Sequence, residues 1–75
     1  MRRGIIIGKP GCFKCKQAQE MLPDFQYYTI SDGPGEKLWH QYATDDIFPV
    51  IVVLEEDRII SNGHNILEAM RVMKE

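Results

Sequence analysis

The sequence is organised around one stretch near its N-terminus, Gly8-Lys9-Pro10-Gly11-Cys12-Phe13-Lys14-Cys15-Lys16. This stretch contains both cysteines of the 75-residue chain and three of its 9 basic residues. An apolar run, Ile5 to Ile7, precedes it and predicts a buried strand. Pro10-Gly11 ends that strand, and a helix is predicted over residues 13–22. The stretch therefore places a Cys-x-x-Cys pair where a strand gives way to a helix.

Cys12 is expected at or just before the N-terminus of this helix. The unpaired backbone N–H groups and the positive end of the helix dipole favour an anion there, and here the anion is a thiolate. Lys9, Lys14 and Lys16 act in the same direction. Cys15 lies one turn further on, where a Cβ separation of roughly 5–6 Å needs little adjustment to form a disulfide. The spacing therefore predicts a reversible dithiol–disulfide site.

Three other interpretations of the cysteine pair stay open. Two cysteines could form half of a zinc site, but four ligands are needed, and His40 and His64 are the only other soft candidates, at a spacing that fits no zinc finger. A structural disulfide would close a very small loop and constrain the unfolded chain little. The third interpretation is a pair of buried thiols without a role. We favour redox chemistry and predict no metal site, because a cytosolic Cys-x-x-Cys pair is more often catalytic than structural.

Length and composition indicate one soluble domain over residues 1–75. A chain of this length buries only about 60% of its unfolded surface, and 44% hydrophobic with 27% charged residues is ordinary for a globular protein. The net charge of −2 gives no electrostatic case for nucleic-acid binding. The run of three isoleucines is too short for a signal peptide or a membrane span. We expect a cytoplasmic monomer without a membrane partner.

The rest of the chain predicts three more strands and two more helices. The strands are expected over residues 25–30, 48–54 and 58–61, and the helices over residues 36–42 and 66–73, with turns at 31–35 and 55–57 and a loop at 62–64. Asn65, with Glu68 three residues later, is a variant of the capping box that begins the last helix. This order predicts an α/β fold, with a mixed four-stranded sheet of order 2-1-3-4 and helices on both faces.

Three separated motifs together resemble those of glutaredoxins, which belong to the thioredoxin superfamily. They are Cys12-Phe13-Lys14-Cys15 at the first helix, Phe48-Pro49-Val50 before a central strand, and Asn62-Gly63-His64-Asn65 before the last helix. The resemblance covers nearly the whole chain and implies a thioredoxin-like fold. The length is similar to that of the smallest glutaredoxins and of the small redoxins, including bacteriophage ones, that donate hydrogen to ribonucleotide reductase.

The resemblance also implies roles for single residues. Cys12 would be the nucleophile, Cys15 the resolving thiol, and Pro49 a cis proline facing them. Lys9 would hold a carboxylate of glutathione, with a solvated surface lysine as the alternative. The implied substrate or glutathione contacts are completed by Phe13, Phe48, Gly63, His64 and Asn65.

Two departures from the glutaredoxin pattern bear on these roles. Phe13-Lys14 stands between the cysteines where glutaredoxins typically carry Pro-Tyr, so the redox potential does not follow from the family. The Gly-Gly-x-Asp glutathione signature is replaced by Asn62-Gly63-His64-Asn65, which keeps one glycine and exchanges the carboxylate for an amide. A well-capped helix without a glutathione site is the alternative. Asp45-Asp46 is expected near the cleft, where it would oppose an anionic ligand or form a solvated loop.

We therefore expect an enzyme, a glutaredoxin-like thiol-disulfide oxidoreductase. It would need no tightly bound cofactor, and its reductant would be glutathione or, alternatively, a thioredoxin reductase. Its substrates would be proteins with disulfides, such as ribonucleotide reductase. The rival hypothesis is a non-catalytic redoxin-fold module that binds a partner enzyme and does not need its thiols.

Overall fold

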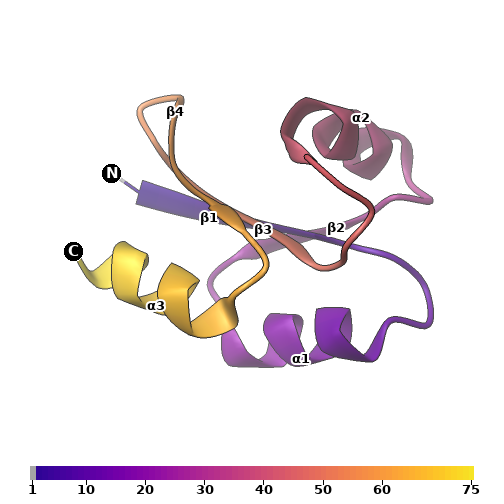
Figure 1. The fold of residues 1–75 in the computed structure, drawn as a ribbon, viewed down its shortest axis with the longest axis horizontal. Helices are drawn as coiled ribbons and strands as arrows, with labels where there is room; N and C mark the ends of the chain where they lie inside the picture. Colours follow the sequence, from indigo (N-terminus) through magenta and orange to yellow (C-terminus); the bar gives the residue numbers. More distant parts are fainter. Residues whose placement is uncertain (1) are drawn as a thin grey trace.

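The computed structural model describes residues 2–75. Its elements are β1 (Arg2–Gly8), α1 (Phe13–Met21), β2 (Gln26–Thr29), α2 (Gly33–Tyr42), β3 (Val50–Glu55), β4 (Arg58–Gly63) and α3 (Ile66–Lys74). The strands form one sheet in the order β2-β1-β3-β4, in which β1 is parallel to β2 and antiparallel to β3, and β4 is antiparallel to β3 (Figure 1). The predicted strand order and mixed pairing are confirmed.

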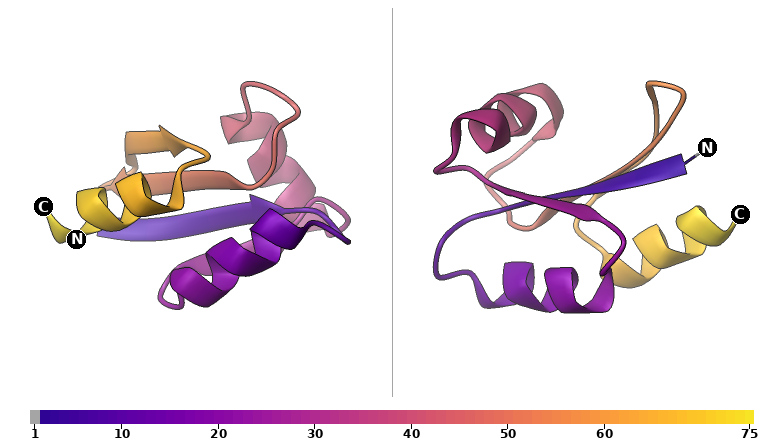
Figure 2. Two further views of the ribbon diagram at one scale, coloured as in Figure 1. Left: turned by 60° about the horizontal axis from the view of Figure 1, so that its bottom comes forward. Right: turned by 180° about the vertical axis from the view of Figure 1, so that it is seen from behind.

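The helices cover both faces of this sheet. Helices α1 and α3 lie together on one face and α2 lies alone on the other, as two views of the ribbon agree (Figures 1 and 2). The two inner strands are buried on both faces because their side chains alternate between the layers. Ile6 belongs to the core under α1 and α3, whereas Ile5 and Ile7 belong to the core under α2. The unbroken apolar runs of β1 and β3 thus fill two separate cores.

Several element boundaries differ from those predicted from the sequence, among them the beginning of β3, at Val50 instead of residue 48. Helix α2 begins at Gly33, so Gly33-Pro34-Gly35 forms its first turn instead of a turn before it. A proline is tolerated there because the first N–H groups of a helix have no intrahelical partner to lose. Strand β4 continues to Gly63, pairing Asn62 and Gly63 with β3 where a loop was expected. Strand β1 begins at Arg2, which pairs with Glu55.

The C-terminal helix is held at both of its ends. Asn65 accepts a hydrogen bond from the backbone N–H of Glu68 at 3.0 Å, which confirms the predicted N-cap. At the other end the Arg2 guanidinium donates to the backbone carbonyl of Val72 and to the carboxylate of Glu55. Within residues 2–75 no helix is long and apolar enough to span a membrane.

Candidate dithiol active site

The two cysteines meet at the beginning of α1. Cys12 is the N-cap residue, and its sulfur accepts a hydrogen bond from the backbone N–H of Cys15 at 3.2 Å. The cysteines form a disulfide with Cα atoms 5.3 Å apart. Cys12 is partly exposed, whereas the side chain of Cys15 is 0% exposed. The predicted placement at the helix N-terminus is confirmed, and only one of the two sulfurs faces solvent.

Glycines shape the turn that delivers the cysteines. Gly11 adopts φ +77°, a left-handed conformation that other residues rarely adopt, and this lets the chain turn from β1 into α1. At Gly8 the reason is space: a Cβ there would lie 2.8 Å from the Cβ and 3.1 Å from the sulfur of Cys15, and would also collide with the hydroxyl of Tyr27. Cys15 is therefore packed directly on the backbone of the strand that leads to the site.

Phe48-Pro49 lies immediately before β3, and its peptide bond is cis, as the resemblance implied. The ring of Phe48 stacks on Trp39 of α2, with centroids 6.1 Å apart and planes 11° apart. The ammonium of Lys9 lies 5.3 Å from the centroid of the Phe48 ring, within the range of a cation–π contact. The structure thus brings Lys9 and Phe48 together. Trp39, which the sequence did not single out as a site residue, supports them.

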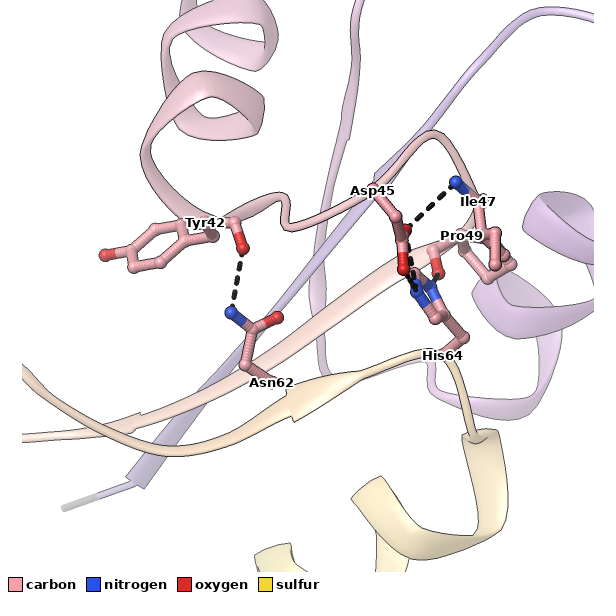
Figure 3. Close-up of polar contacts among 6 residues, drawn as sticks. All are labelled: Tyr42, Asp45, Ile47, Pro49, Asn62 and His64. Carbon is pink, nitrogen blue, oxygen red and sulfur yellow. Dashed lines mark hydrogen bonds and ion pairs between the residues drawn. The ribbon is translucent and has the colours of Figure 1, made fainter.

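His64 connects the end of β4 to the loop before β3 (Figure 3). Its Nδ1 is 2.6 Å from the carbonyl oxygen of Pro49, and its Nε2 is 3.1 Å and 3.3 Å from the two carboxylate oxygens of Asp45. The backbone N–H of Ile47 donates to the same carboxylate at 3.0 Å. That N–H, and then the imidazole of His64, hold the pKa of Asp45 below its usual value. Asp45 is therefore a partner of His64.

A second contact fastens the same loop on its other side. The side-chain amide of Asn62 donates to the backbone carbonyl of Tyr42, at the end of α2, at 2.8 Å (Figure 3). The 43–49 segment is consequently tied at its beginning by Asn62 and at its end by His64. From the sequence, the run 62–65 was expected to bind glutathione or to cap α3. No local pattern indicated that the side chains of Asn62 and His64 bind this loop.

Five of the predicted contact residues line two cavities. One, of about 410 Å³, is lined by Lys9, Cys12 and Phe13, together with Lys16 and Tyr27. The other, of about 330 Å³, is lined by Pro49, His64 and Asn65, together with Lys14 and Leu67.

The other two predicted contact residues, Phe48 and Gly63, line neither cavity, and Phe13 lines the first but is largely exposed. Phe13 is 78% exposed. Gly63 pairs with Ile51 inside the sheet. Among residues 2–75, no three His, Cys, Asp or Glu side chains are grouped so as to hold a metal ion.

Neither the scan against protein families nor the search of curated proteins gave a match. Solved structures do match. A chain of the ferredoxin:thioredoxin reductase–thioredoxin f2 complex superposes with a TM-score of 0.67 at 9% identity, over 99% of this chain and 78% of that one. Chlamydomonas reinhardtii thioredoxin f2 superposes with a TM-score of 0.65 at 10% identity, over 97% of this chain and 76% of that one. The Drosophila melanogaster thioredoxin Deadhead superposes with a TM-score of 0.63 at 14% identity, over 96% of this chain and 79% of that one. The chain has the thioredoxin fold.

Proposed function

We propose that this protein is a thiol-disulfide oxidoreductase of the glutaredoxin-like type. The observation that carries the proposal is the Cys12–Cys15 disulfide at the N-terminus of α1, with one sulfur accessible and the other buried. A closed disulfide between residues three apart contributes little to stability through loop closure, so chemistry is the better reason for it. The thioredoxin fold and the order of the three sequence motifs support the same conclusion.

In the proposed reaction the reduced protein transfers two electrons to a substrate disulfide. The Cys12 thiolate attacks one substrate sulfur and forms a mixed disulfide, and the other substrate sulfur leaves as a thiolate and takes a proton from water. Cys15 loses its proton and attacks Cys12, which releases the second substrate thiol and leaves the Cys12–Cys15 bridge. An external thiol or reductase must then reduce this bridge before the next cycle.

The segment before β3 is suited to hold an extended substrate chain. The pairing of β1 with β3 ends at Ile7 and Val50, so Phe48 lies beyond the last pair of the sheet. Its backbone can therefore pair with a substrate segment as an added strand, a mode in which main-chain hydrogen bonds supply affinity and few side chains select sequence. We accordingly propose broad protein substrates, ribonucleotide reductase among them.

We propose glutathione as the reductant. Lys9 is exposed beside Cys12 and suits one carboxylate. The first N–H groups of α3 suit another, because helix N-termini bind anions and Asn65 occupies only the N–H of Glu68. His64 contributes less than expected, since both of its ring nitrogens already have partners. A thioredoxin reductase is the alternative donor.

One coupled assay tests the function and its reductant together. Oxidised protein is mixed with glutathione and glutathione reductase, or separately with thioredoxin reductase, and NADPH consumption is followed in the presence of insulin as a disulfide substrate. We expect turnover with the glutathione system, and none from a Cys12→Ser variant. Turnover only with thioredoxin reductase would reassign the donor. No turnover with either would contradict the enzymatic proposal and favour the non-catalytic module.

A further inference from the structure

The buried position of Cys15 poses a chemical problem for the proposed reaction, on which this inference rests. Cys15 must become a thiolate to attack Cys12, but its side chain is 0% exposed. Within residues 2–75 no polar or charged residue is buried, so no buried carboxylate is present to take the proton. Another group must connect the Cys15 sulfur to solvent.

The hydroxyl of Tyr27 and this sulfur both lie close to the position that a Cβ of Gly8 would occupy. Tyr27 pairs with Ile6 in the sheet and packs with it on the face covered by α1 and α3. A Cβ at Gly8 would meet the Tyr27 hydroxyl as well as the Cβ and the sulfur of Cys15, so these groups converge over one backbone position. Because Gly8 has no side chain, both groups can approach this position.

Tyr27 also reaches the solvent side of the site. It lines the cavity of about 410 Å³ that contains Cys12, the accessible sulfur. The other ionisable side chains of this cavity are Lys9 and Lys16, whose positive charges favour a thiolate nearby. The Tyr27 side chain thus reaches from the surroundings of the buried sulfur to the cavity beside Cys12.

We propose that the Tyr27 hydroxyl relays the proton of Cys15 to solvent during the resolving step. In the mixed disulfide, the Cys15 proton passes to the phenol oxygen as the phenol proton passes to water in the cavity. The Cys15 sulfur then forms a bond to the Cys12 sulfur, the bond between Cys12 and the substrate breaks, and the substrate sulfur leaves with the electron pair. The phenol is neutral before and after the step, so the relay consumes no other reactant.

The ionisation of Tyr27 suits this role. Burial raises the pKa of its phenol above the usual 10.0, so the hydroxyl keeps its proton throughout the neutral range. A neutral phenol can accept one proton while it donates another, and it can donate a hydrogen bond to the thiolate that forms. A hydroxyl that ionised near neutral pH would instead place a negative charge beside the developing thiolate.

The neighbouring Tyr28 is a matched control. Its side chain packs on the opposite face of the sheet, against the core under α2, and its hydroxyl donates to Gln26 at 3.0 Å. Tyr27→Phe and Tyr28→Phe each remove one hydroxyl from β2 and keep the ring. Only the first removes the group that we place beside Cys15.

The two sulfurs can be followed separately with dithiobis(nitrobenzoate), a chromogenic disulfide. Attack by Cys12 releases one coloured thiolate, and attack by Cys15 on the resulting mixed disulfide releases a second. With reduced protein in stopped flow, we expect Tyr27→Phe to leave the first phase unchanged and to slow the second about 100-fold, at the lower end of general acid–base contributions. The rate of the second phase in Tyr27→Phe should rise with pH at higher pH values than in the parent protein. Tyr28→Phe should match the parent protein in both phases.

The outcomes separate this inference from the proposed function. A second phase equal to that of the parent protein at every pH would overturn the relay, as would an equal slowing of both phases, which indicates altered packing. A parent protein whose first phase is no faster than that of free cysteine would instead contradict the oxidoreductase proposal. Should Tyr27→Phe fold poorly by circular dichroism, the parent protein in D₂O decides: the relay requires a slower second phase, and its absence rejects the relay.

Discussion

The imidazole Nδ1 of His64 donates a hydrogen bond to the carbonyl oxygen of Pro49 at 2.6 Å. A carbonyl oxygen can only accept, so Nδ1 carries a proton. The other nitrogen, Nε2, faces the Asp45 carboxylate at 3.1 Å, and an ionised carboxylate also only accepts. The imidazole thus links the 43–49 loop, through both Pro49 and Asp45, to the residue just before α3.

Two conservative substitutions separate the two hydrogen bonds of His64. The amide nitrogen of asparagine can occupy the position of Nδ1 and keep the bond to Pro49, whereas that of glutamine can reach the position of Nε2 and keep the bond to Asp45. Because the bond to Pro49 is short and partly buried, we expect His64→Gln to lower the free energy of unfolding by about 1 kcal/mol, and His64→Asn to lower it less. Urea unfolding of both variants measures the difference. An equal loss in the two variants would mean that the Pro49 contact is not the important one.

The pairing of Asp45 predicts a dependence of stability on pH. The N–H of Ile47 and the imidazole of His64 hold the pKa of Asp45 below 3.8 in the folded protein. A carboxyl group whose pKa is depressed on folding stabilises the protein above its unfolded value, and this stabilisation is lost as the pH falls through the lower folded value. We therefore expect the Asp45→Asn variant to be less stable than the parent protein at pH 7. The difference in stability between the two proteins should become smaller below about pH 4. Thermal unfolding across this range checks the prediction. A difference that stays constant with pH would argue against an ionised Asp45 as the partner of His64.

The close packing on Gly8 predicts that any side chain at that position lowers the stability of the fold. A Cβ there would lie 2.8 Å from the Cβ of Cys15, and neither the strand nor the helix can move freely. We expect Gly8→Ala to destabilise the fold by about 1–3 kcal/mol, the usual range for overpacking. This corresponds to a fall in Tm of at least about 4 °C for a domain of this size. Gly63→Ala is the control: nothing in the described chain lies within 4 Å of a Cβ at Gly63, so its stability should be unchanged or slightly higher.

The architecture could be predicted because it depends on local patterns. The apolar run over residues 48–54 is too apolar to leave one face in water, and the shorter run at residues 5–7 predicted a second buried strand, so both inner strands could be identified from the sequence. Asn65 and Glu68 gave the beginning of α3 in the same way. The beginning of α2 was missed, because Gly33-Pro34-Gly35 has the composition of a turn and only the three-dimensional path shows that it is helical.

The supporting contacts of the site could not be predicted, because they join residues that are distant in the sequence. His64 and Pro49 are 15 positions apart and come from different elements, and no periodicity links them. The approach of Tyr27 to Cys15 depends on the parallel register of β1 and β2, which places Tyr27 opposite Ile6. The sequence identified the reacting sulfurs, whereas packing determined which side chains surround them.

The unequal exposure of the two sulfurs predicts unequal reactivity of the reduced thiols. Cys12 is partly exposed and stands at the N-terminus of α1, where its sulfur already accepts the N–H of Cys15. The same N–H and the helix dipole should stabilise a thiolate, so we expect the Cys12 thiol to titrate below the free-cysteine pKa of about 8.5. Iodoacetamide should therefore modify Cys12 first at neutral pH, as peptide mass spectrometry would establish.

Serine variants of Cys12 and Cys15 test the same difference between the two thiols through disulfide reduction. Cys12→Ser should lose disulfide reduction entirely, because the buried Cys15 cannot reach a protein substrate. Cys15→Ser should keep the first attack and lose the second, so it should accumulate mixed disulfides that non-reducing electrophoresis detects and dithiothreitol releases. If Cys15 were alkylated before Cys12, or if Cys12→Ser trapped substrate in place of Cys15→Ser, the roles of the two sulfurs would have to be exchanged, and the exposure of Cys12 would no longer explain the chemistry.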